Sequence, residues 1–252
     1  MSIPLLPEIP PELVVYDRPS PCPYLPDRVA RLPLRLPVRR LSPKELEARL
    51  AAGDRRQGPL LYRTECPRCA ACEPIRIPVA DFELSRRHRR VLSRGNRELR
   101  TEIGRPHVDG RRVSLYNGHK AGRGLSDGQA AIDPQGYEDF LVDTCCDTFE
   151  LRYFLGEELV GVAITDRSDQ GLSAVYCYYD PAHASLSIGT YSILKQLELC
   201  RERALPYLYL GLYIADSPHM VYKGQFRPHE RLLEGRAVRG FPGAQEAARA
   251  RG

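Results

Sequence analysis

The sequence predicts an α+β protein with an N-terminal cysteine-rich, basic subdomain (residues 1–100), a second subdomain (residues 101–240) and a flexible tail (residues 241–252). Three observations support this prediction. A length of 252 residues can supply one large core or two smaller ones. Apolar residues at helical spacing and alternating apolar segments occur in the same chain. Strand-like patterns become more frequent after about residue 150, which places the main sheet in the second half.

The first half should consist of short elements. Ten of the 22 prolines lie within the first 37 residues, which favours extended or surface-hugging chain there. Ser42, Pro43 and Glu45 have the pattern of a capping box, so a helix should begin there and run to about Ala52. Two short strands, 60–65 and 73–79, should flank a knuckle of cysteines, and a second helix, capped by Ser85, should follow.

The second half should begin with a helix over residues 137–149 and continue mainly as strands. The expected elements are a hairpin at 150–166, a strand at 172–180, an amphipathic helix at 190–203, a buried strand at 207–214 and a last short element at 220–226. Hairpin, strand, glycine-containing turn, helix and strand follow one another as in a GNAT-like acyltransferase core. In that fold, backbone amides at the turn and helix start can hold a phosphate or an acyl carbonyl.

The composition is that of an ordinary soluble protein, with 42% hydrophobic and 27% charged residues. No segment approaches the roughly 18 apolar residues of a membrane span, and the N-terminus lacks a secretory signal pattern. We therefore expect a cytoplasmic protein with no membrane partner. Cysteines in such a protein are expected to be reduced, and four of the eight lie in apolar segments as candidate buried residues: Cys145, Cys146, Cys177 and Cys200.

Three of the other cysteines form a C-x2-C-x2-C run at Cys66, Cys69 and Cys72. Thiols at this spacing can converge on one metal ion or cluster from a tight loop, and Cys22 is the candidate fourth ligand. The spacing suits zinc and an iron–sulfur cluster equally. Four redox-responsive thiols without a metal are the alternative.

The cysteine run leads into a strongly basic stretch. Residues 86–100 hold seven arginines and a single acidic residue, Glu98, although the formal net charge of the whole chain is only +5. Such a concentration is suited to neutralising phosphates, and a solvated helix face is the alternative. The predicted nucleic-acid contacts are Arg86, Arg87, Arg89, Arg90 and Arg94.

Six segments of the chain resemble the aminoacyl-tRNA–protein transferases, a family of arginyltransferases and bacterial aspartate/glutamate leucyltransferases. They are residues 21–28, 61–77, 82–90, 179–191, 209–214 and 223–228. The resemblance extends from about Pro21 to Arg231. It implies that an aminoacyl group moves from the 3′ end of tRNA to the α-amine of a protein whose N-terminal residue is acidic, which marks that protein for degradation. It also implies zinc or an iron–sulfur cluster as the group held by the cysteines.

An aminoacyl ester is already activated, so this reaction needs mainly positioning, a base for the attacking amine and donors for the oxyanion. Asp180, or a water that it holds, is the predicted base, and capping of the turn before Pro181 is the alternative. Tyr179 and His183 are further catalytic candidates. Tyr178, Tyr179 and Tyr191 could relay protons, stack on the terminal adenine or simply pack.

Substrate contacts are predicted around two turns. The turn before the 190–203 helix has one glycine, whereas a pyrophosphate loop for CoA should have several, so no CoA is expected. The predicted donor contacts are Ser187, Gly189 and Thr190. Cations should hold the acidic side chain of the acceptor, and surface charge is the alternative. These candidates are Arg76, Lys223 and Arg227. We interpret His88, His107 and His119 as phosphate contacts or exposed residues.

The donor amino acid is less strongly indicated. The N-terminal segments look more like the leucyltransferases, whereas residues 222–228 look nearer the arginyltransferases, and leucyl is favoured. Asp216 is the candidate for discriminating between the two side chains. From other classes, a CoA-dependent N-acetyltransferase and a non-catalytic RNA-binding module are the alternatives.

Overall fold

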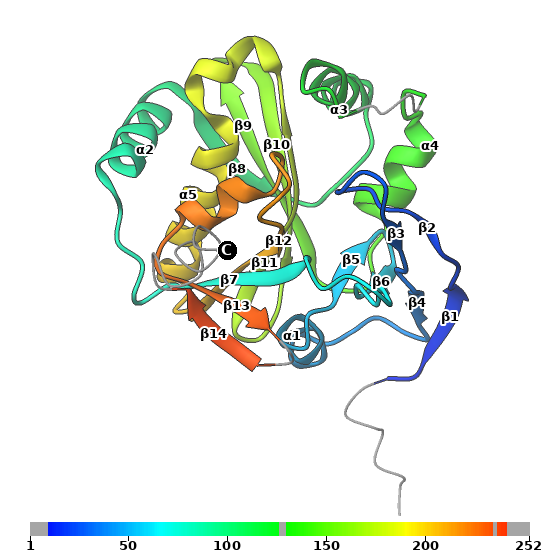
Figure 1. Cartoon of the computed structure of the whole chain (residues 1–252). Coiled ribbons are helices and arrows are strands. Elements are labelled where there is room, and N and C mark those ends of the chain that lie inside the picture. Colours follow the sequence, from blue (N-terminus) through cyan, green and yellow to red (C-terminus); the bar gives the residue numbers. More distant parts are fainter. Residues whose placement is uncertain (1–9, 126–129, 234–235, 241–252) are drawn as a thin grey trace, which may run out of the picture.

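The computed structural model describes residues 10–125, 130–233 and 236–240, the last of these as backbone only. The expected tail at 241–252 lies outside the described residues. Helices and strands alternate, so the predicted α+β class is confirmed (Figure 1). No helix of the described chain is long and apolar enough to cross a bilayer.

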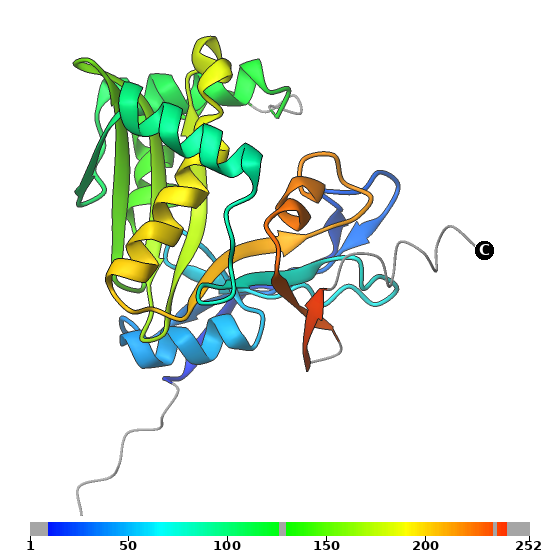
Figure 2. The ribbon, with the colours of Figure 1, turned by 90° about the vertical axis from the view of Figure 1, so that its left-hand side faces the viewer.

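An eight-stranded, mostly antiparallel sheet organises the molecule (Figures 1 and 2). Its strands, in spatial order, are β14 (Arg236–Gly240), β13 (His229–Leu233), β7 (Glu73–Pro78), β12 (Tyr207–Tyr213), β11 (Gly171–Tyr179), β10 (Glu158–Arg167), β9 (Thr148–Leu155) and β8 (Arg100–Gly104). The expected hairpin is β9–β10, which turns at Gly156 with a φ of +58°. The predicted boundary at residue 100 runs through this sheet, because β7 lies between β12 and β13.

Helices cover both faces of the β9–β11 part of this sheet. On one face, α2 (Arg86–Glu98) and α5 (Ile188–Glu202) pack on each other and on a core that includes Leu151, Val160 and Leu197. On the other face, α3 (Gly110–Gly122) and α4 (Pro134–Tyr137) cover a smaller cluster around Tyr137 and Tyr178. Figure 1 shows the two helix pairs on opposite sides of β9 and β10.

The N-terminal chain forms a separate small sheet. Its order is β1 (Glu12–Tyr16), β4 (Leu34–Pro37), β6 (Leu60–Tyr62) and β5 (Arg55–Gln57), and β2 (Ser20–Pro21) pairs with β3 (Val29–Ala30). The proline-rich chain thus provides edge and two-residue strands, as predicted. The predicted capping box is confirmed in α1 (Pro43–Ala51), where the Ser42 and Glu45 side chains satisfy each other's backbone amides.

The parallel strands β11 and β12 pair over only three residues, from Gly171 opposite Tyr207 to Ser173 opposite Tyr209, and then separate. The neighbouring pairing of β12 with β7 shifts register between Tyr209 and Leu212. Gly211 lies in this bulge with a φ of +79°, a backbone conformation that favours glycine. The two strands therefore diverge toward their carboxyl ends.

One expected element differs from the structure. The helix predicted for 137–149 is replaced by α4 and one π-helical turn, η1 (Glu138–Val142), and Phe149 already belongs to β9. The apolar residues Tyr137 and Leu141 are fully buried at helical spacing, but the chain leaves the helix at Asp143 with extended backbone. The last element, at 220–226, is a 3₁₀ helix, η3 (Val221–Gln225).

Candidate active site

The candidate site lies where β11 and β12 diverge, at the start of α5. Ser187, just before the helix, has a left-handed backbone (φ +54°), and no side chain caps the first turn. A helix begun in this way presents unpaired backbone N–H groups that suit a carbonyl oxygen or a phosphate. Gly189 packs close to Tyr179, since a Cβ at Gly189 would lie 3.4 Å from the Tyr179 ring. Ser187, Gly189 and Thr190 are half-buried in this turn.

The predicted base, Asp180, follows β11 directly. Its carboxylate accepts a hydrogen bond from the backbone N–H of Ala182 at 2.9 Å, so it caps the 3₁₀ helix η2 (Pro181–Leu186). His183 is in the same helix and is half-buried. The structure thus brings Asp180, His183 and Tyr179 to the same turn, and the capping contact leaves the role of Asp180 as base a prediction.

Two residues that the sequence did not assign to the site surround Tyr179. The Nδ1 atom of His119 lies 3.1 Å from the Tyr179 carbonyl oxygen and 3.2 Å from its backbone nitrogen, and the two rings meet edge to face. Arg123 donates to the Tyr179 hydroxyl at 3.0 Å. Burial lowers the pKa of His119, so this ring stays neutral at pH 7. His119 belongs to α3 and Arg123 directly follows this helix, far from the turn in sequence, and no local pattern marks them.

Two interpretations of the sequence, those of His88 and His119, are wrong because the side chains are buried. His88 is only 6% exposed, stacked on Phe226, and His119 is 5% exposed. Neither can be a surface phosphate contact, whereas His107 is exposed as expected. Tyr178 and Tyr191 are core residues. Tyr178 shares a hydrogen bond with Tyr137, which excludes adenine stacking at that position.

The 3₁₀ helix η3 lies between the ends of the two diverging strands. Tyr222 is 41% exposed, but its hydroxyl is desolvated near Cys177 and Tyr179 of β11, and burial raises the pKa of Tyr222 to about 12. The next residue, Lys223, points the other way and donates to the Leu212 carbonyl of β12 at 2.8 Å. Burial, reinforced by the charge of Arg55, lowers the pKa of Lys223 to about 7.

The other two predicted acceptor contacts, Arg76 and Arg227, differ from Lys223 in their surroundings. Arg76 donates to Glu230 at 2.7 Å and to the Tyr209 hydroxyl at 3.1 Å, and its guanidinium stacks on Tyr207. Its charge is therefore already matched within the fold. Arg227 is exposed and donates only to the Gly224 carbonyl, at 3.1 Å. Asp216 is exposed in the turn after β12.

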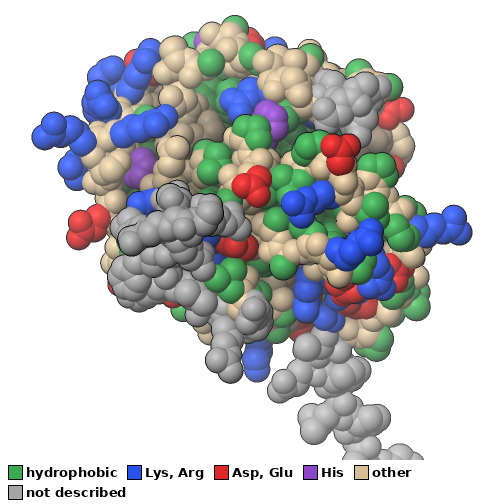
Figure 3. Space-filling model, in the orientation of Figure 1, with side chains coloured by type: hydrophobic (Ala, Val, Ile, Leu, Met, Phe, Trp, Pro, Cys, Tyr) green, Lys and Arg blue, Asp and Glu red, His purple; other side chains and the backbone are tan. Residues whose placement is uncertain are grey.

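The basic helix lies beside the candidate site. The five predicted nucleic-acid contacts are exposed on α2, and Figure 3 shows Lys and Arg side chains gathered in that region of the surface. Arg94 donates to the Ser185 carbonyl in η2 at 3.2 Å, which ties the helix to the turn before α5. Close packing of α2 on α5 is possible because residue 95 is glycine: a Cβ there would lie 2.3 Å from the Tyr191 ring.

The four candidate metal ligands come from two loops, and three of the thiols are near enough to act on Cys72. Burial, followed by the neighbouring Cys22, Cys66 and Cys69, raises the pKa of the Cys72 thiol to about 12. The Arg31 backbone N–H donates to the Cys66 sulfur at 3.4 Å, and Arg28 donates to the Cys69 sulfur at 3.5 Å. The donor set is thus chemically suited to a soft metal. Within the described chain, however, no three Cys, His, Asp or Glu side chains have the spacing of a metal site.

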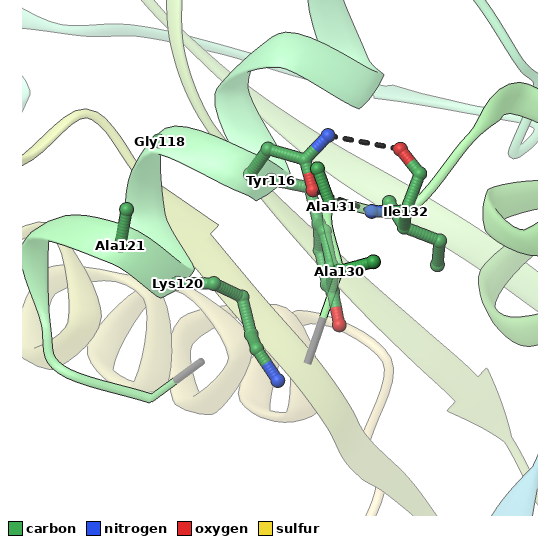
Figure 4. A pocket seen from close by; sticks show the side chains of 8 residues that line it. Tyr116, Gly118, Lys120, Ala121, Ala130, Ala131 and Ile132 are labelled. Carbon is green, nitrogen blue, oxygen red and sulfur yellow. Dashed lines mark hydrogen bonds between the residues drawn. The ribbon is translucent and has the colours of Figure 1, made fainter. Parts of the chain in front are cut away.

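A separate cavity of about 460 Å³ lies between α3 and the segment 130–132. Asn117 closes one side: its side-chain amide donates to the Ile132 carbonyl and accepts from the Ile132 backbone N–H, at 2.9 Å each (Figure 4). Lys120 and Ala121 also line it. None of the candidate site residues lines this cavity.

Most of this chain matches one protein family and its named members. Residues 20–90 match the model described as "Arginine-tRNA-protein transferase, N terminus", and residues 111–233 match "Arginine-tRNA-protein transferase, C terminus". The aspartate/glutamate leucyltransferase of Thiobacillus denitrificans is 37% identical over 85% of this chain and 89% of its own length. The enzyme of that name from Halorhodospira halophila is 39% identical over 86% and 92%.

Among solved structures, the C-terminal domain of a putative lysylphosphatidylglycerol synthetase from Agrobacterium fabrum has a TM-score of 0.45 and 14% identity, covering 57% of this chain and 47% of that one. A structure of FemX has a TM-score of 0.43 and 11% identity, covering 68% and 60%.

Proposed function

This chain belongs to the arginine-tRNA-protein transferase family, and from that premise we propose that it transfers leucine from leucyl-tRNA to the α-amine of proteins beginning with Asp or Glu. Such transfer marks the acceptor for N-degron proteolysis. The relatives named aspartate/glutamate leucyltransferase cover nearly the whole chain, which favours leucine over arginine as the donor side chain.

One observation carries the proposal: the exposed arginines of α2 adjoin the uncapped start of α5 at the opening between β11 and β12. A tRNA acceptor stem on α2 would deliver its 3′ ester to that opening. The separation of β11 from β12 beside the start of α5 also supports a GNAT-like core. In that core the backbone amides of the first turn of α5 would receive the ester carbonyl or the oxyanion, with no CoA involved.

The chemistry then depends on side chains beside this turn. The attacking amine must lose a proton, and Asp180 or a water bound to it would accept that proton. Tyr179, held by Arg123 and His119, would line the path between Asp180 and the ester. His183 is the second candidate base. Ser187, Gly189 and Thr190 would orient the donor through their backbone.

The test is transfer of radiolabelled leucine or arginine from charged tRNA to matched reporters that begin with Asp, Glu or Asn. Label from leucyl-tRNA on the Asp and Glu reporters alone is expected. Label from arginyl-tRNA alone would show that the donated amino acid is arginine and not leucine. Asp216→Ala would then be tested for loss of selectivity between the two tRNAs. Absence of transfer from either tRNA, with acetyl-CoA serving as donor instead, would establish the N-acetyltransferase alternative.

For the cysteines we propose that Cys22, Cys66, Cys69 and Cys72 together hold zinc or an iron–sulfur cluster, because the other three thiols lie near enough to raise the pKa of Cys72 and N–H groups donate to two of the sulfurs. Metal analysis of protein purified anaerobically would test this. Wild type and Cys200→Ala, in which a core cysteine is changed, should contain the same metal, and Cys69→Ser should lose it. Wild-type protein without zinc or iron would refute the proposal and favour redox-responsive thiols.

A further inference from the structure

Two buried cations, Arg55 and Lys223, lie beside Gly211. Arg55 is 6% exposed and Lys223 is 9% exposed, and neither forms an ion pair with any described residue. The other buried arginines differ, since Arg56 binds Asp166 at 2.8 Å and Arg112 binds Glu150. Buried charges are normally paired, so this pair lacks the anion that the rest of the fold supplies to its cations.

Both cations border the same small space. Arg55 donates to the carbonyls of Asp54 (2.6 Å) and Gly211 (2.7 Å), and its Nε atom is buried without a hydrogen-bond partner. Lys223 donates to the Leu212 carbonyl and, at 3.3 Å, to the Met220 sulfur. A Cβ built at Gly211 would lie 3.6 Å from Lys223 Nζ and 3.9 Å from Arg55 Nε. The space left by the missing side chain of Gly211 thus adjoins both donors.

The charge balance of this space favours an anion. Burial lowers the pKa of Arg55, and burial together with Arg55 lowers that of Lys223 to about 7. Desolvation therefore disfavours the charged form of both side chains, and the charge of Arg55 adds to this effect at Lys223. A carboxylate between them would offset both desolvated charges and give the Arg55 Nε–H its absent acceptor.

We propose that Arg55 and Lys223 form the pocket that receives the acidic side chain of the acceptor's N-terminal residue. The inference rests on the proposed function. A carboxylate at the end of a short side chain can reach cations that are nine-tenths buried, whereas a phosphodiester, flanked by sugars on both sides, requires an open groove. The acidic side chain is therefore the ligand that the burial favours.

The position of the pair suits the reaction. Lys223 and Tyr222 are neighbours on η3, and Tyr222 lies against the end of β11 at the candidate acyl site. Arg55 also lines a cavity of about 160 Å³ between α1, β7, β12 and β13. An acceptor whose carboxylate is held at Gly211 would have its α-amine near the opening between β11 and β12.

The test uses full-length protein and paired peptides that begin with Asp or with the neutral Asn. Leucyl transfer is measured for wild type, Arg55→Gln, Arg55→Lys, Lys223→Gln and the control Arg111→Gln, which removes an exposed arginine of α3. Losing one hydrogen bond to a buried carboxylate should raise the KM for the Asp peptide at least about 30-fold. The KM for leucyl-tRNA should stay within about twofold, and Arg55→Lys should recover part of the loss.

The preference for Asp over Asn should collapse in Arg55→Gln and Lys223→Gln but not in Arg111→Gln. An unchanged preference in variants that keep the wild-type melting temperature would overturn the proposal, as would a rise in the KM for leucyl-tRNA instead of the peptide, since the pair would then bind RNA phosphate. Should wild type transfer no leucine, calorimetric binding of the Asp peptide to wild type and Lys223→Gln tests the pocket by itself. Equal binding to both proteins would refute it.

Discussion

Replacing Gly95 by alanine should destabilise the protein, although alanine is the better helix former. Gly95 is buried in α2 where this helix crosses α5. An added Cβ would lie 2.3, 2.4 and 2.9 Å from three atoms of the Tyr191 ring. The ring cannot easily turn away, because Tyr191 is 1% exposed and its hydroxyl bonds both Asn96 and Thr101. The helices must therefore separate to admit the methyl group.

The size of the effect follows from two opposing contributions. Alanine gains about 1 kcal/mol over glycine in a helix interior. Overpacking a well-filled contact costs about 1–3 kcal/mol, and contacts this short belong at the upper end. The net change should be a loss of about 1–2 kcal/mol, or a melting temperature lower by about 2–8 °C. Gly118 of α3 is a matched control, because nothing lies within 4 Å of the Cβ that would be added there.

Urea unfolding of wild type, Gly95→Ala and Gly118→Ala gives the comparison directly. Gly118→Ala should be as stable as wild type or more stable by up to about 1 kcal/mol. Gly95→Ala should also raise the KM for leucyl-tRNA, because α2 carries the arginines that lie beside the candidate site. A Gly95→Ala protein at least as stable as Gly118→Ala would show that the contact between α2 and α5 is not tightly packed, contrary to this reasoning.

Three further results are expected. Lys223 has a pKa of about 7 in the fold and near 10.5 when unfolded, so the unfolded state binds more protons between these values. Stability of wild type relative to Lys223→Met should therefore rise from pH 7 to pH 10 in urea titrations, and a flat difference would contradict the burial of the amine. Asp166→Ala should lose about 3–5 kcal/mol by leaving Arg56 buried and unpaired, whereas Arg56→Met combined with Asp166→Leu should lose less, as thermal unfolding can measure. Removing arginines from α2 should weaken tRNA binding. The slope of log affinity against log salt concentration should fall by about 1 for each phosphate that is no longer neutralised. An unchanged slope would show that α2 is an ordinary solvated helix face. The variants for this last series are Arg86→Gln, Arg87→Gln and Arg90→Gln.

Local patterns predicted local structure well. Ser42 and Ser85 each cap a helix where the sequence indicates one, because a capping side chain bonds amides only three residues away. The hairpin at Gly156 is similarly determined by its turn. The prediction of a helix at 137–149 was wrong because two helical turns are enough to bury Tyr137 and Leu141. Thr148 and Phe149 pair instead with β10 as the start of β9.

Long-range contacts were not predictable from one sequence. Arg76 is a basic residue in a motif, yet its charge is matched by Glu230, which lies 154 residues away and gives no local signal. Arg55, by contrast, lies in none of the motifs. Its proposed role depends on Gly211 and Lys223, which are near it only in the folded chain. His119 joins Tyr179 only through the packing of α3 on β11. Which charges stay unmatched is a property of the folded molecule.

The place of β7 has a consequence for how the chain folds during synthesis. This strand is made early, at residues 73–78, but both of its neighbours in the large sheet are made late, β12 at 207–213 and β13 at 229–233. A ribosome must therefore polymerise more than half of the protein before the edges of β7 can be paired. Until then its exposed backbone is a site for aggregation or for chaperone binding. If the gene were cut near residue 100, the first polypeptide would hold only β7 of the large sheet and the second would lack this strand. The two should associate into active protein only when expressed together.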